Sequence, residues 1–434
     1  MESPSKKLLI LASKLGYQTR SFADAAANLG VDVTFATDRC HKLADPWGDG
    51  ALPLRFSDPV QAADEIALHF KSARPDAVLA LGDHPTVAAA YAARALGLPA
   101  NAPHAVERCC NKLLQRQTLH GAGLPVPQFF SFALADPIST VLPNVKFPCV
   151  VKPLSLTASQ GVIRANNEEQ FRSAVSRIAA LLNSPEIRVT RDEGLDRLLV
   201  ESYIPGAEVA MEGLLESGRL RILAIFDKPD PLEGPYFEET IYVTPSRLTA
   251  KQLAALRDCA TRSLSALGLT HGPIHAEFRV HDEDPWVLEV APRPIGGLCS
   301  RALRFGPQRG SLEELLIRHA LSLGGDNVDR ESEAAGVMMI PVPRSGIFEG
   351  VEGLQNAART VNVTGIEITA RLKDHVAVWP EGASYLGFIF AHAMEPSDVE
   401  AALRQAHREL RFHFSERLPV EHPVTGKISA GHSR

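Results

Sequence analysis

The chain has 434 residues, of which 45% are apolar and 22% are charged, and its formal net charge is −6. This composition is typical of a globular protein with a large core, and it argues against long disordered segments and membrane spans. The negative charge balance gives no electrostatic reason to expect nucleic acid as the main partner.

Neither the first residues nor the cysteines point to secretion. The start MESPSKK leads into a short strand-like run rather than into the apolar segment of a signal peptide. None of the six cysteines stands in a C-x-x-C pair, which fits reduced thiols. We therefore expect a cytoplasmic protein.

The first hundred residues alternate between strand and helix patterns. Apolar runs at 8–11 and 31–36 flank an amphipathic segment at 21–29, and a third run at 76–81 precedes an alanine-rich helix. This order predicts βαβ units with a parallel sheet. No G-x-G-x-x-G follows the first strand, which excludes the Rossmann fingerprint. His84 follows the third strand, where open α/β sheets bind ligands, although a packing role fits it equally well.

Two lysines come next, each beside a structured segment. Residues 106–120 read as one helix that carries Lys112, and residues 147–153 read as a strand that ends near Lys152. The following loop, 155–161, is rich in small and hydroxylic residues. Such a loop can offer backbone N–H groups to phosphates, and a solvated hairpin is the alternative. It is not a Walker A loop, because G-x-x-x-x-G-K-[ST] is absent.

The stretch 198–208 combines a buried strand with a sharp turn and two carboxylates, Glu201 and Glu208. A segment of this kind can present backbone groups to a flat heterocycle and a carboxylate to a ribose diol. Read singly, each glutamate also fits a surface position.

A β-hairpin is predicted between 276 and 290, with strands at 276–280 and 286–290 and an acidic turn at 281–285. Glu277 and Glu289 then face each other on neighbouring strands, where Cβ atoms of paired residues lie roughly 4.5 to 5.5 Å apart. Two facing carboxylates repel unless a cation lies between them. Mg²⁺ suits this position because it takes oxygen ligands and is commonly shared with nucleotide phosphates; Mn²⁺ is an alternative.

We expect the segment that follows the hairpin to bind an anion. Arg293 stands between two prolines and can clamp a phosphate or carboxylate, and Gly296 and Gly297 allow close backbone approach. His275 lies two residues before Glu277 and therefore shares its strand face. Further candidates for substrate contact, each with a packing or solvated alternative, are His271, Lys228, Arg301 and Arg304.

The C-terminal part shows strand patterns at 337–340 and 376–379 and a helix at 397–410. Charges spaced by four along that helix fit an exposed face. We expect this part to close one side of the substrate site.

Taken in order, these segments resemble the ATP-grasp superfamily of carboxylate–amine and carboxylate–thiol ligases. The motifs are Lys112 before G-x-P-x-P, VVKP with its small-residue loop, VESYIPGAE, HAE and LEVAPRPIGG. Within the superfamily the chain is most similar to the L-amino acid ligases, which join two amino acids through an acyl phosphate. Residues 338–391 resemble the C-terminal domain of those enzymes.

The resemblance implies a role for each matching position. Mg²⁺ would be bound by Glu277 and Glu289, and Arg293, with Gly296 and Gly297, would steady the acyl phosphate. Contacts to ATP would come from the two lysines, from the loop and from the adenine and ribose segment: Lys112, Lys152, Ser155, Ser159, Gly161, Glu201, Ser202, Ile204 and Glu208. Substrate contacts would come from His275, Lys228 and Arg301.

One position departs from the family pattern E-x-N-x-R, because the chain has Ala291 where the third metal ligand is expected. Alanine there resembles the purine-biosynthesis branch that carboxylates aminoimidazole ribonucleotide, although that branch continues with His and Asn. The alternatives to a ligase are therefore a bicarbonate-using carboxylase of purine or biotin type and a nucleotide-binding protein without catalysis.

The resemblance also implies the organisation of the chain. We expect an α/β and α+β protein with three parts: an N-terminal βαβ domain at 1–105, an ATP-grasp region at 106–310 with a small lid at about 125–200, and a C-terminal α+β domain at 311–434. The expected partners are small-molecule substrates such as amino acids, without nucleic acid or membrane, and a second copy of the chain is an expectation by analogy only.

Overall fold

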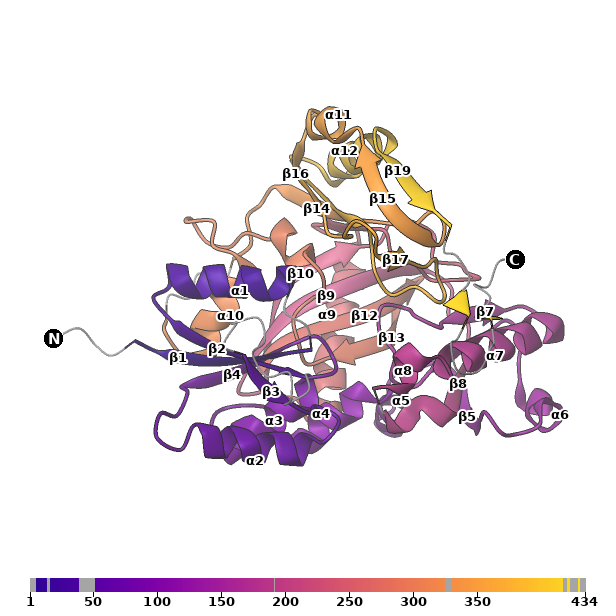
Figure 1. The fold of residues 1–434 in the computed structure, drawn as a ribbon, viewed down its shortest axis with the longest axis horizontal. Helices are drawn as coiled ribbons and strands as arrows, with labels where there is room; N and C mark the ends of the chain where they lie inside the picture. Colours follow the sequence, from indigo (N-terminus) through magenta and orange to yellow (C-terminus); the bar gives the residue numbers. More distant parts are fainter. Residues whose placement is uncertain are drawn as a thin grey trace.

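The computed structural model describes residues 5–13, 16–38, 51–190, 192–324 and 329–416, with two further short strands, β20 (Val420–Glu421) and β21 (Ile428–Ser429). Figure 1 shows three peripheral parts arranged around a central sheet: the N-terminal sheet in indigo, a smaller lid in magenta, and the C-terminal strands in orange and yellow. Within the described ranges, no helix combines the length and the apolar run needed to cross a bilayer.

The N-terminal part is a parallel sheet of order β3-β2-β1-β4, as the βαβ pattern predicts. The two faces of β1 pack differently, because Leu8 and Ile10 join the core under α1 while Leu9 and Leu11 join the core under α2 and α3. The elements are β1 (Lys7–Ala12), α1 (Tyr17–Asn28), β2 (Asp32–Asp38), β3 (Leu52–Leu54), α2 (Pro59–His69), β4 (Ala77–Leu81) and α3 (Thr86–Ala95).

The single helix expected at 106–120 is wrong, since the structure has two helices, α4 (Pro103–Cys110) and α5 (Lys112–Gly121). Asn111 interrupts them with an extended backbone at φ −120° and ψ 112°. Its side chain accepts hydrogen bonds from the N–H groups of Leu113 and Leu114, at 3.0 and 3.2 Å. Asn111 therefore caps a new helix, and Lys112 begins that helix.

The lid is a four-stranded antiparallel sheet of order β5-β8-β6-β7. Helix α7 covers one face, because Phe171, Val175 and Ile178 join the buried side chains of β6 and β8. The elements are β5 (Phe129–Ala133), α6 (Ile138–Val141), η2 (Leu142–Asn144), β6 (Cys149–Pro153), β7 (Ile163–Ala165), α7 (Glu168–Leu182), α8 (Pro185–Arg188), η3 (Glu193–Asp196) and β8 (Arg197–Ser202).

The central sheet has the order β13-β12-β9-β10-β11-β14-β18-β16, so strands from both sides of the expected boundary at 310 form one sheet. Alternate residues of β9 and β12, such as Met211 and Phe278, pack with Leu256 and Leu264 of α9. The residues between them point to the opposite face. The elements are β9 (Ala207–Glu216), β10 (Arg219–Asp227), β11 (Ile241–Thr244), α9 (Ala250–Leu267), β12 (Gly272–His281), β13 (Asp284–Ala291), η4 (Cys299–Ala302), α10 (Leu312–Ala320), β14 (Ala334–Ile340), β16 (Val363–Ile368) and β18 (Gly387–Ala393).

The C-terminal part adds a three-stranded sheet of order β17-β15-β19, while α12 packs on β14 and β18 of the central sheet. The strand expected at 376–379 is too long, because it ends at Val376. The chain turns after it, where Gly382 donates its N–H to the carbonyl of Val378 at 2.8 Å. The elements are β15 (Gly346–Glu352), α11 (Leu354–Ala358), β17 (His375–Val376), α12 (Pro396–Arg408) and β19 (Arg411–Ser415).

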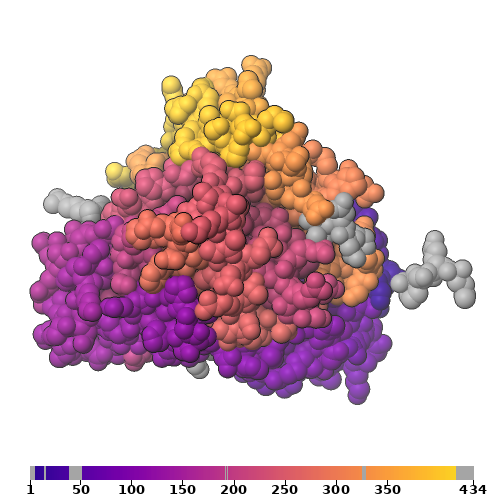
Figure 2. Space-filling view, turned by 180° about the vertical axis from the view of Figure 1, so that it is seen from behind, coloured from indigo at the N-terminus to yellow at the C-terminus, as the bar shows by residue number. Residues whose placement is uncertain are grey.

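The peripheral parts meet at the central sheet. Helix α10 packs against α1, and the Asn28 amide donates to Glu314 at 3.1 Å, so a helix from beyond residue 310 covers the N-terminal sheet. Seen from behind in Figure 2, the rose and coral residues lie between the magenta lid, the indigo N-terminal part and the yellow C-terminal part. A site on the central sheet can therefore draw residues from every part.

Candidate active site

The predicted hairpin is present as β12 and β13, and Glu277 is paired with Glu289. Directly paired residues of an antiparallel ladder point to the same face. The register shifts by one residue just after this pair, so that Phe278 is opposite Val287. The strands also extend further than expected, which shortens the turn to Asp282 and Glu283.

The neighbouring strand β9 extends this polar face. Its pairing places Glu212 opposite His275 and Glu208 opposite Arg279. The Arg279 Nε atom donates to Glu208 at 3.0 Å, His275 Nδ1 contacts Glu212, and His275 Nε2 lies 3.4 Å from Glu277. Burial disfavours the charged imidazole, but the two carboxylates outweigh burial and raise the pKa of His275 to about 9.

A buried lysine lies among three carboxylates on this face. The Lys228 ammonium is 2.8 Å from Glu208 and 3.1 Å from Glu277, and it also contacts Glu239. Burial disfavours its charge, yet the three carboxylates raise the pKa of Lys228 well above its usual value. Burial raises the pKa of the Glu239 carboxyl to about 7, and Tyr242 donates to it at 2.7 Å.

Lys112 lies beside the second hairpin carboxylate. Its ammonium is 3.5 Å from Glu289 and donates to the carbonyl of Leu156 at 3.0 Å. Its backbone N–H donates to the carbonyl of Leu154, so the start of α5 and the predicted phosphate loop are joined. The Oγ atom of Ser155, in the same loop, is buried and has no hydrogen-bond partner among the described residues. A buried hydroxyl without a partner fits a site that would receive a ligand oxygen.

Lys152 and Glu201 form a buried ion pair between β6 and β8. The Lys152 ammonium is 2.6 Å from Glu201, and Arg116 Nε donates to the same carboxylate at 2.6 Å. Burial alone would raise the pKa of Glu201, but the two cations lower that pKa below its usual value. Desolvation lowers the pKa of Lys152. Two cations share the one carboxylate, so the cluster of Lys152, Arg116 and Glu201 keeps a net positive charge at the end of β6, where the loop begins.

Arg293 is held by the N-terminal part. Its Nε and Nη2 atoms donate to the two oxygens of Asp83, both at 2.8 Å, and Nη1 donates to the carbonyl of Pro294 at 3.1 Å. Burial opposes the charge of Asp83, but the guanidinium lowers the pKa of that carboxyl below its usual value. A bidentate pair of this kind fixes both the position and the plane of the guanidinium.

The two glycines after Arg293 lie against the C-terminal part. Gly297 has φ +64°, and a Cβ atom there would lie 2.9 Å from the ring of Phe388. The backbone N–H of Ile295 donates to Glu212 at 3.1 Å. A Cβ atom on Gly296 would have no atom of another described residue within 4 Å, apart from its chain neighbours, so a ligand could approach this backbone closely.

The remaining predicted residues have other contacts. Ser202 exchanges hydrogen bonds with Gln128, and the carbonyl of Ile204 accepts from Arg279 at 2.8 Å. Arg301 pairs with Glu367 of β16 rather than with the cluster on the central sheet. Ser159 and Gly161 have positive φ values, +54° and +71°. His84 lies 2.8 Å from Asp38, the His271 ring centroid lies 4.8 Å from that of His319, and Arg304 donates to the Leu303 carbonyl at 2.7 Å.

Sequence reasoning missed Asp83, Arg116, Glu212 and Glu239. Two of these carry a signal that could have found them. Arg116 follows Lys112 by four residues, which places both on one helix face. Glu212 follows Glu208 by four residues on a strand, which also gives a shared face. Asp83 and Glu239 lie in connecting segments, so no periodicity marks them.

A cavity of about 650 Å³ opens beside this cluster, within the range of ordinary ligand pockets. Glu208 and Lys228 line it from the central sheet, and Tyr203 and Gly206 line it from the segment that joins the lid. The predicted adenine and ribose segment therefore borders an open space.

The hairpin pair fits a divalent cation better than the cluster around Lys228. The oxygens of Glu208, Glu239 and Glu277 lie within 4.8 Å of one another, but cationic side chains already pair with them: Lys228 contacts all three, Arg279 contacts Glu208, and His275 lies beside Glu277. The Glu289 side chain is 31% exposed, and among the described residues its cationic partner is Lys112, at 3.5 Å. Oxygen ligands with incomplete neutralisation are what Mg²⁺ requires.

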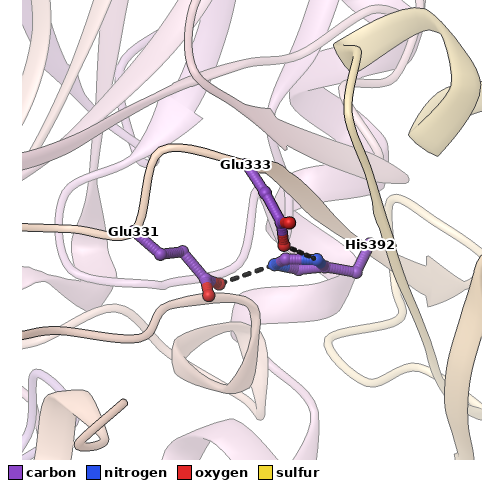
Figure 3. Close-up of side chains that lie close together, drawn as sticks. All are labelled: Glu331, Glu333 and His392. Carbon is purple, nitrogen blue, oxygen red and sulfur yellow. Dashed lines mark hydrogen bonds and ion pairs between the residues drawn. The ribbon is translucent and has the colours of Figure 1, made fainter. Parts of the chain in front are cut away.

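A separate trio is formed by Glu331, Glu333 and His392, and His392 lies near the C-terminal end of β18 (Figure 3). The imidazole is placed between the two carboxylates, at 2.6 Å from Glu331 and 3.1 Å from Glu333. Arg309 lies 2.6 Å from Glu331. None of the predicted site residues belongs to this trio, whose carboxylates contact His392 and, at Glu331, also Arg309.

Three family models match the chain. An ATP-grasp N-terminal domain matches residues 23–100, an ATP-grasp domain matches 145–302, and an L-amino acid ligase C-terminal domain 2 matches 338–415. The crystal structure of an L-amino acid ligase from Bacillus licheniformis aligns with a TM-score of 0.80 and 28% identity, over 95% of this chain and 100% of that chain.

Two curated relatives extend the comparison. Uncharacterized protein y4rH of Sinorhizobium fredii is 26% identical over 72% of this chain, and this chain spans 63% of that protein, less than two thirds of its length. A D-alanine–D-alanine ligase of Synechococcus sp. is 28% identical over 58% of this chain and 73% of that protein. The chain carries ATP-grasp domains, and its fold is the ATP-grasp fold with an N-terminal and a C-terminal domain.

Proposed function

We propose that this ATP-grasp protein is an ATP-dependent carboxylate–amine ligase that joins amino acids through an acyl phosphate and releases ADP and phosphate. The observation that carries the proposal is the facing pair Glu277 and Glu289, set between Lys112 and Lys228 and close in sequence to Arg293. The likeness to an L-amino acid ligase structure and to the C-terminal domain of that family supports amino acid substrates.

The first step is a phosphoryl transfer. A carboxylate oxygen of one substrate attacks the γ-phosphorus of ATP, and the bond from that phosphorus to the bridging oxygen of ADP breaks. Such transfers depend on positioning and on neutralising charge. Lys112 and Lys152 would neutralise the phosphates, and Glu277 and Glu289 would hold Mg²⁺, which supplies charge neutralisation of the phosphate oxygens when bound.

The second step forms the amide bond. The amine nitrogen of the second substrate attacks the carbonyl carbon of the acyl phosphate, the new C–N bond forms, and the C–O bond to phosphate breaks. Arg293, oriented by Asp83, would face the departing phosphate. The amine must lose a proton, and Glu239, with its pKa raised to about 7, is suited to accept it near neutral pH.

A carboxylase that uses bicarbonate is the second candidate. The observation that favours it is Ala291, which stands where the usual family pattern has Asn. Ala291 is buried at the end of β13, opposite His275, and it offers no side-chain oxygen. Bicarbonate would then take the place of the carboxylate substrate, and the same phosphoryl transfer would activate it.

The test is phosphate release from ATP, measured over pairs of amino acids with and without bicarbonate. Release that requires two amino acids, together with a new dipeptide detected by mass spectrometry, would support the ligase. Hydroxylamine added with a single amino acid would trap the acyl phosphate as a hydroxamate. Release that requires bicarbonate would support the carboxylase, and ATP binding without any release would overturn both enzymatic proposals.

A further inference from the structure

A turn of the C-terminal part is bonded to the predicted phosphate loop. The indole Nε1 of Trp379 donates to the carbonyl of Ala158 at 2.9 Å. The backbone N–H of Gly161 donates to the carbonyl of Pro380 at 2.8 Å, and the Gln160 amide donates to the carbonyl of Glu381 at 2.7 Å. These three hydrogen bonds span more than 200 positions of the chain, so local sequence does not produce them.

An ion pair reinforces the same contact from the lid helix. Arg177 of α7 donates Nη2 to Glu381 at 2.7 Å, and its Nε contacts the other oxygen of that carboxylate. The hydrogen bonds to Glu381 raise the pKa of Arg177. Arg177 also contacts the hydroxyl of Tyr236, which comes from the segment beside Glu239. Both partners of the ion pair are more than one third exposed, so solvent weakens the pair and the three hydrogen bonds matter more.

The loop needs such support because of its backbone. Ala158 and Ser159 have φ values of +53° and +54°, in the left-handed region that residues with a side chain seldom adopt. Gly161 follows at φ +71°, where a Cβ atom would press on Leu181 and Pro153 at 3.2 to 3.3 Å. A free loop would leave this conformation readily, so outside contacts must hold it.

The support is also connected to the residues around Arg293. Trp379 is buried and lies with its ring 5.1 Å from that of Tyr385, which in turn lies 6.4 Å from Phe388. Phe388 is the side chain that a Cβ on Gly297 would meet. A row of aromatic rings therefore runs from the loop to the glycines beside the candidate anion clamp.

We propose that Trp379 and Glu381 are positioning residues, through which the C-terminal domain holds loop 155–161 closed over the nucleotide. This rests on the proposed function, because it assigns the loop to ATP phosphates. A closed loop keeps water from the acyl phosphate, so that phosphate release stays coupled to amide formation. The Trp379 hydrogen bond fixes the loop backbone, and the Glu381 ion pair fixes the lid helix behind it.

The experiment compares Trp379→Phe and Glu381→Gln with matched controls. The phenylalanine keeps an aromatic ring beside Tyr385 and removes the N–H donor; the glutamine keeps the shape and removes the charge. The controls are Trp286→Phe on the outer hairpin strand and Glu168→Gln, which breaks an exposed ion pair with Arg172 on the same helix α7.

Two quantities are measured. The first is phosphate released per amide bond formed, and the second is amide hydrogen exchange of the peptide 154–163. Removing one hydrogen bond shifts a closing equilibrium by about two- to tenfold. We expect both quantities to rise by that factor in Trp379→Phe and by a smaller factor, up to about fivefold, in Glu381→Gln, which weakens a partly exposed ion pair. Both quantities should stay at the wild-type level in the controls, and in the test variants KM for ATP should rise more than kcat falls.

The outcomes separate this proposal from the proposed function. If no substrate pair gives ATP-dependent phosphate release, the ligase proposal fails, yet faster exchange of 154–163 in both test variants would still support the contact as the restraint on the loop. Unchanged exchange and an unchanged phosphate-to-amide ratio in both variants would overturn it. Glu381→Gln keeps the test valid if Trp379→Phe unfolds, because Glu381 is more than one third exposed.

Discussion

Charged side chains on the polar face of β9 and β12 are paired with opposite charges and are largely shielded from solvent. His275 is 7% exposed and lies between Glu212 and Glu277. Its pKa of about 9 means that the imidazole is protonated in the folded chain at neutral pH. In an unfolded chain the same group has a pKa of about 6.5. The difference makes this residue a source of pH-dependent stability.

The free energy of unfolding should fall as the pH rises from about 6.5 to about 9. The folded-state pKa of His275 is above the unfolded value, so its stabilisation is complete below pH 6.5 and is lost as the pH passes the folded-state pKa. The shift corresponds to about 3 kcal/mol at most. Urea unfolding from pH 6 to 9 measures the slope. In His275→Gln the slope should flatten, and an equal slope in both proteins would contradict this assignment.

Substitution of the carboxylates can identify which of them bind Mg²⁺. Glu277→Gln and Glu289→Gln should each raise the Mg²⁺ concentration for half-maximal phosphate release by about tenfold or more, since each removes the negative charge of one of few ligands. Glu239→Gln should leave that concentration unchanged, because Glu239 is not part of the hairpin pair and its carboxylate is bonded to Lys228 and Tyr242. A magnesium titration of the three variants is the measurement. If Glu239→Gln raised the required Mg²⁺ concentration and Glu289→Gln did not, the metal site would be the cluster around Lys228 rather than the hairpin pair.

At the scale of helices and strands, local sequence patterns predicted the elements that form from residues close together in the chain. The βαβ order and the hairpin with Glu277 facing Glu289 follow from strand patterns and a turn, and both are present. The break at Asn111 was missed because a capping side chain inside a helical pattern competes with helix continuity. The neighbours β11 and β14 are distant in sequence, and no local pattern encodes their pairing.

The junction between the lid and the central sheet depends on one glycine. Gly206 has φ +104°, and a Cβ atom there would lie 2.3 Å from the carbonyl oxygen of Val280 on β12. Gly206→Ala should therefore lower the free energy of unfolding by about 2 kcal/mol or more, since both the backbone and the contact are unfavourable. Gly218→Ala is the control, because Gly218 also has positive φ but faces open space. Thermal unfolding compares them, and equal losses would show that the contact with β12 is unimportant.

At the scale of the whole molecule, the candidate site is assembled from parts that the sequence shows separately. The lysines, the hairpin and Arg293 could be predicted because each lies in a motif. Asp83 could not be linked to Arg293, because the pair joins residues 210 positions apart across two parts of the fold. The contact between Trp379 and Ala158 could not be predicted for the same reason, because the two residues are 221 positions apart. Motifs thus identify candidate site residues, while the orientation of those residues depends on the tertiary structure.

The pair of Asp83 and Arg293 predicts a measurable coupling between the N-terminal domain and the site. Asp83→Asn should lower kcat by about tenfold with a smaller change in KM for ATP, because the guanidinium loses its bidentate acceptor while the nucleotide contacts stay. Arg293→Lys should lower kcat as well, and the double variant should be little worse than either single variant. In a double-mutant cycle on kcat/KM, contacting residues couple by about 0.5 to 3 kcal/mol. Additive effects, with a coupling under about 0.5 kcal/mol, would mean that Asp83 does not orient Arg293.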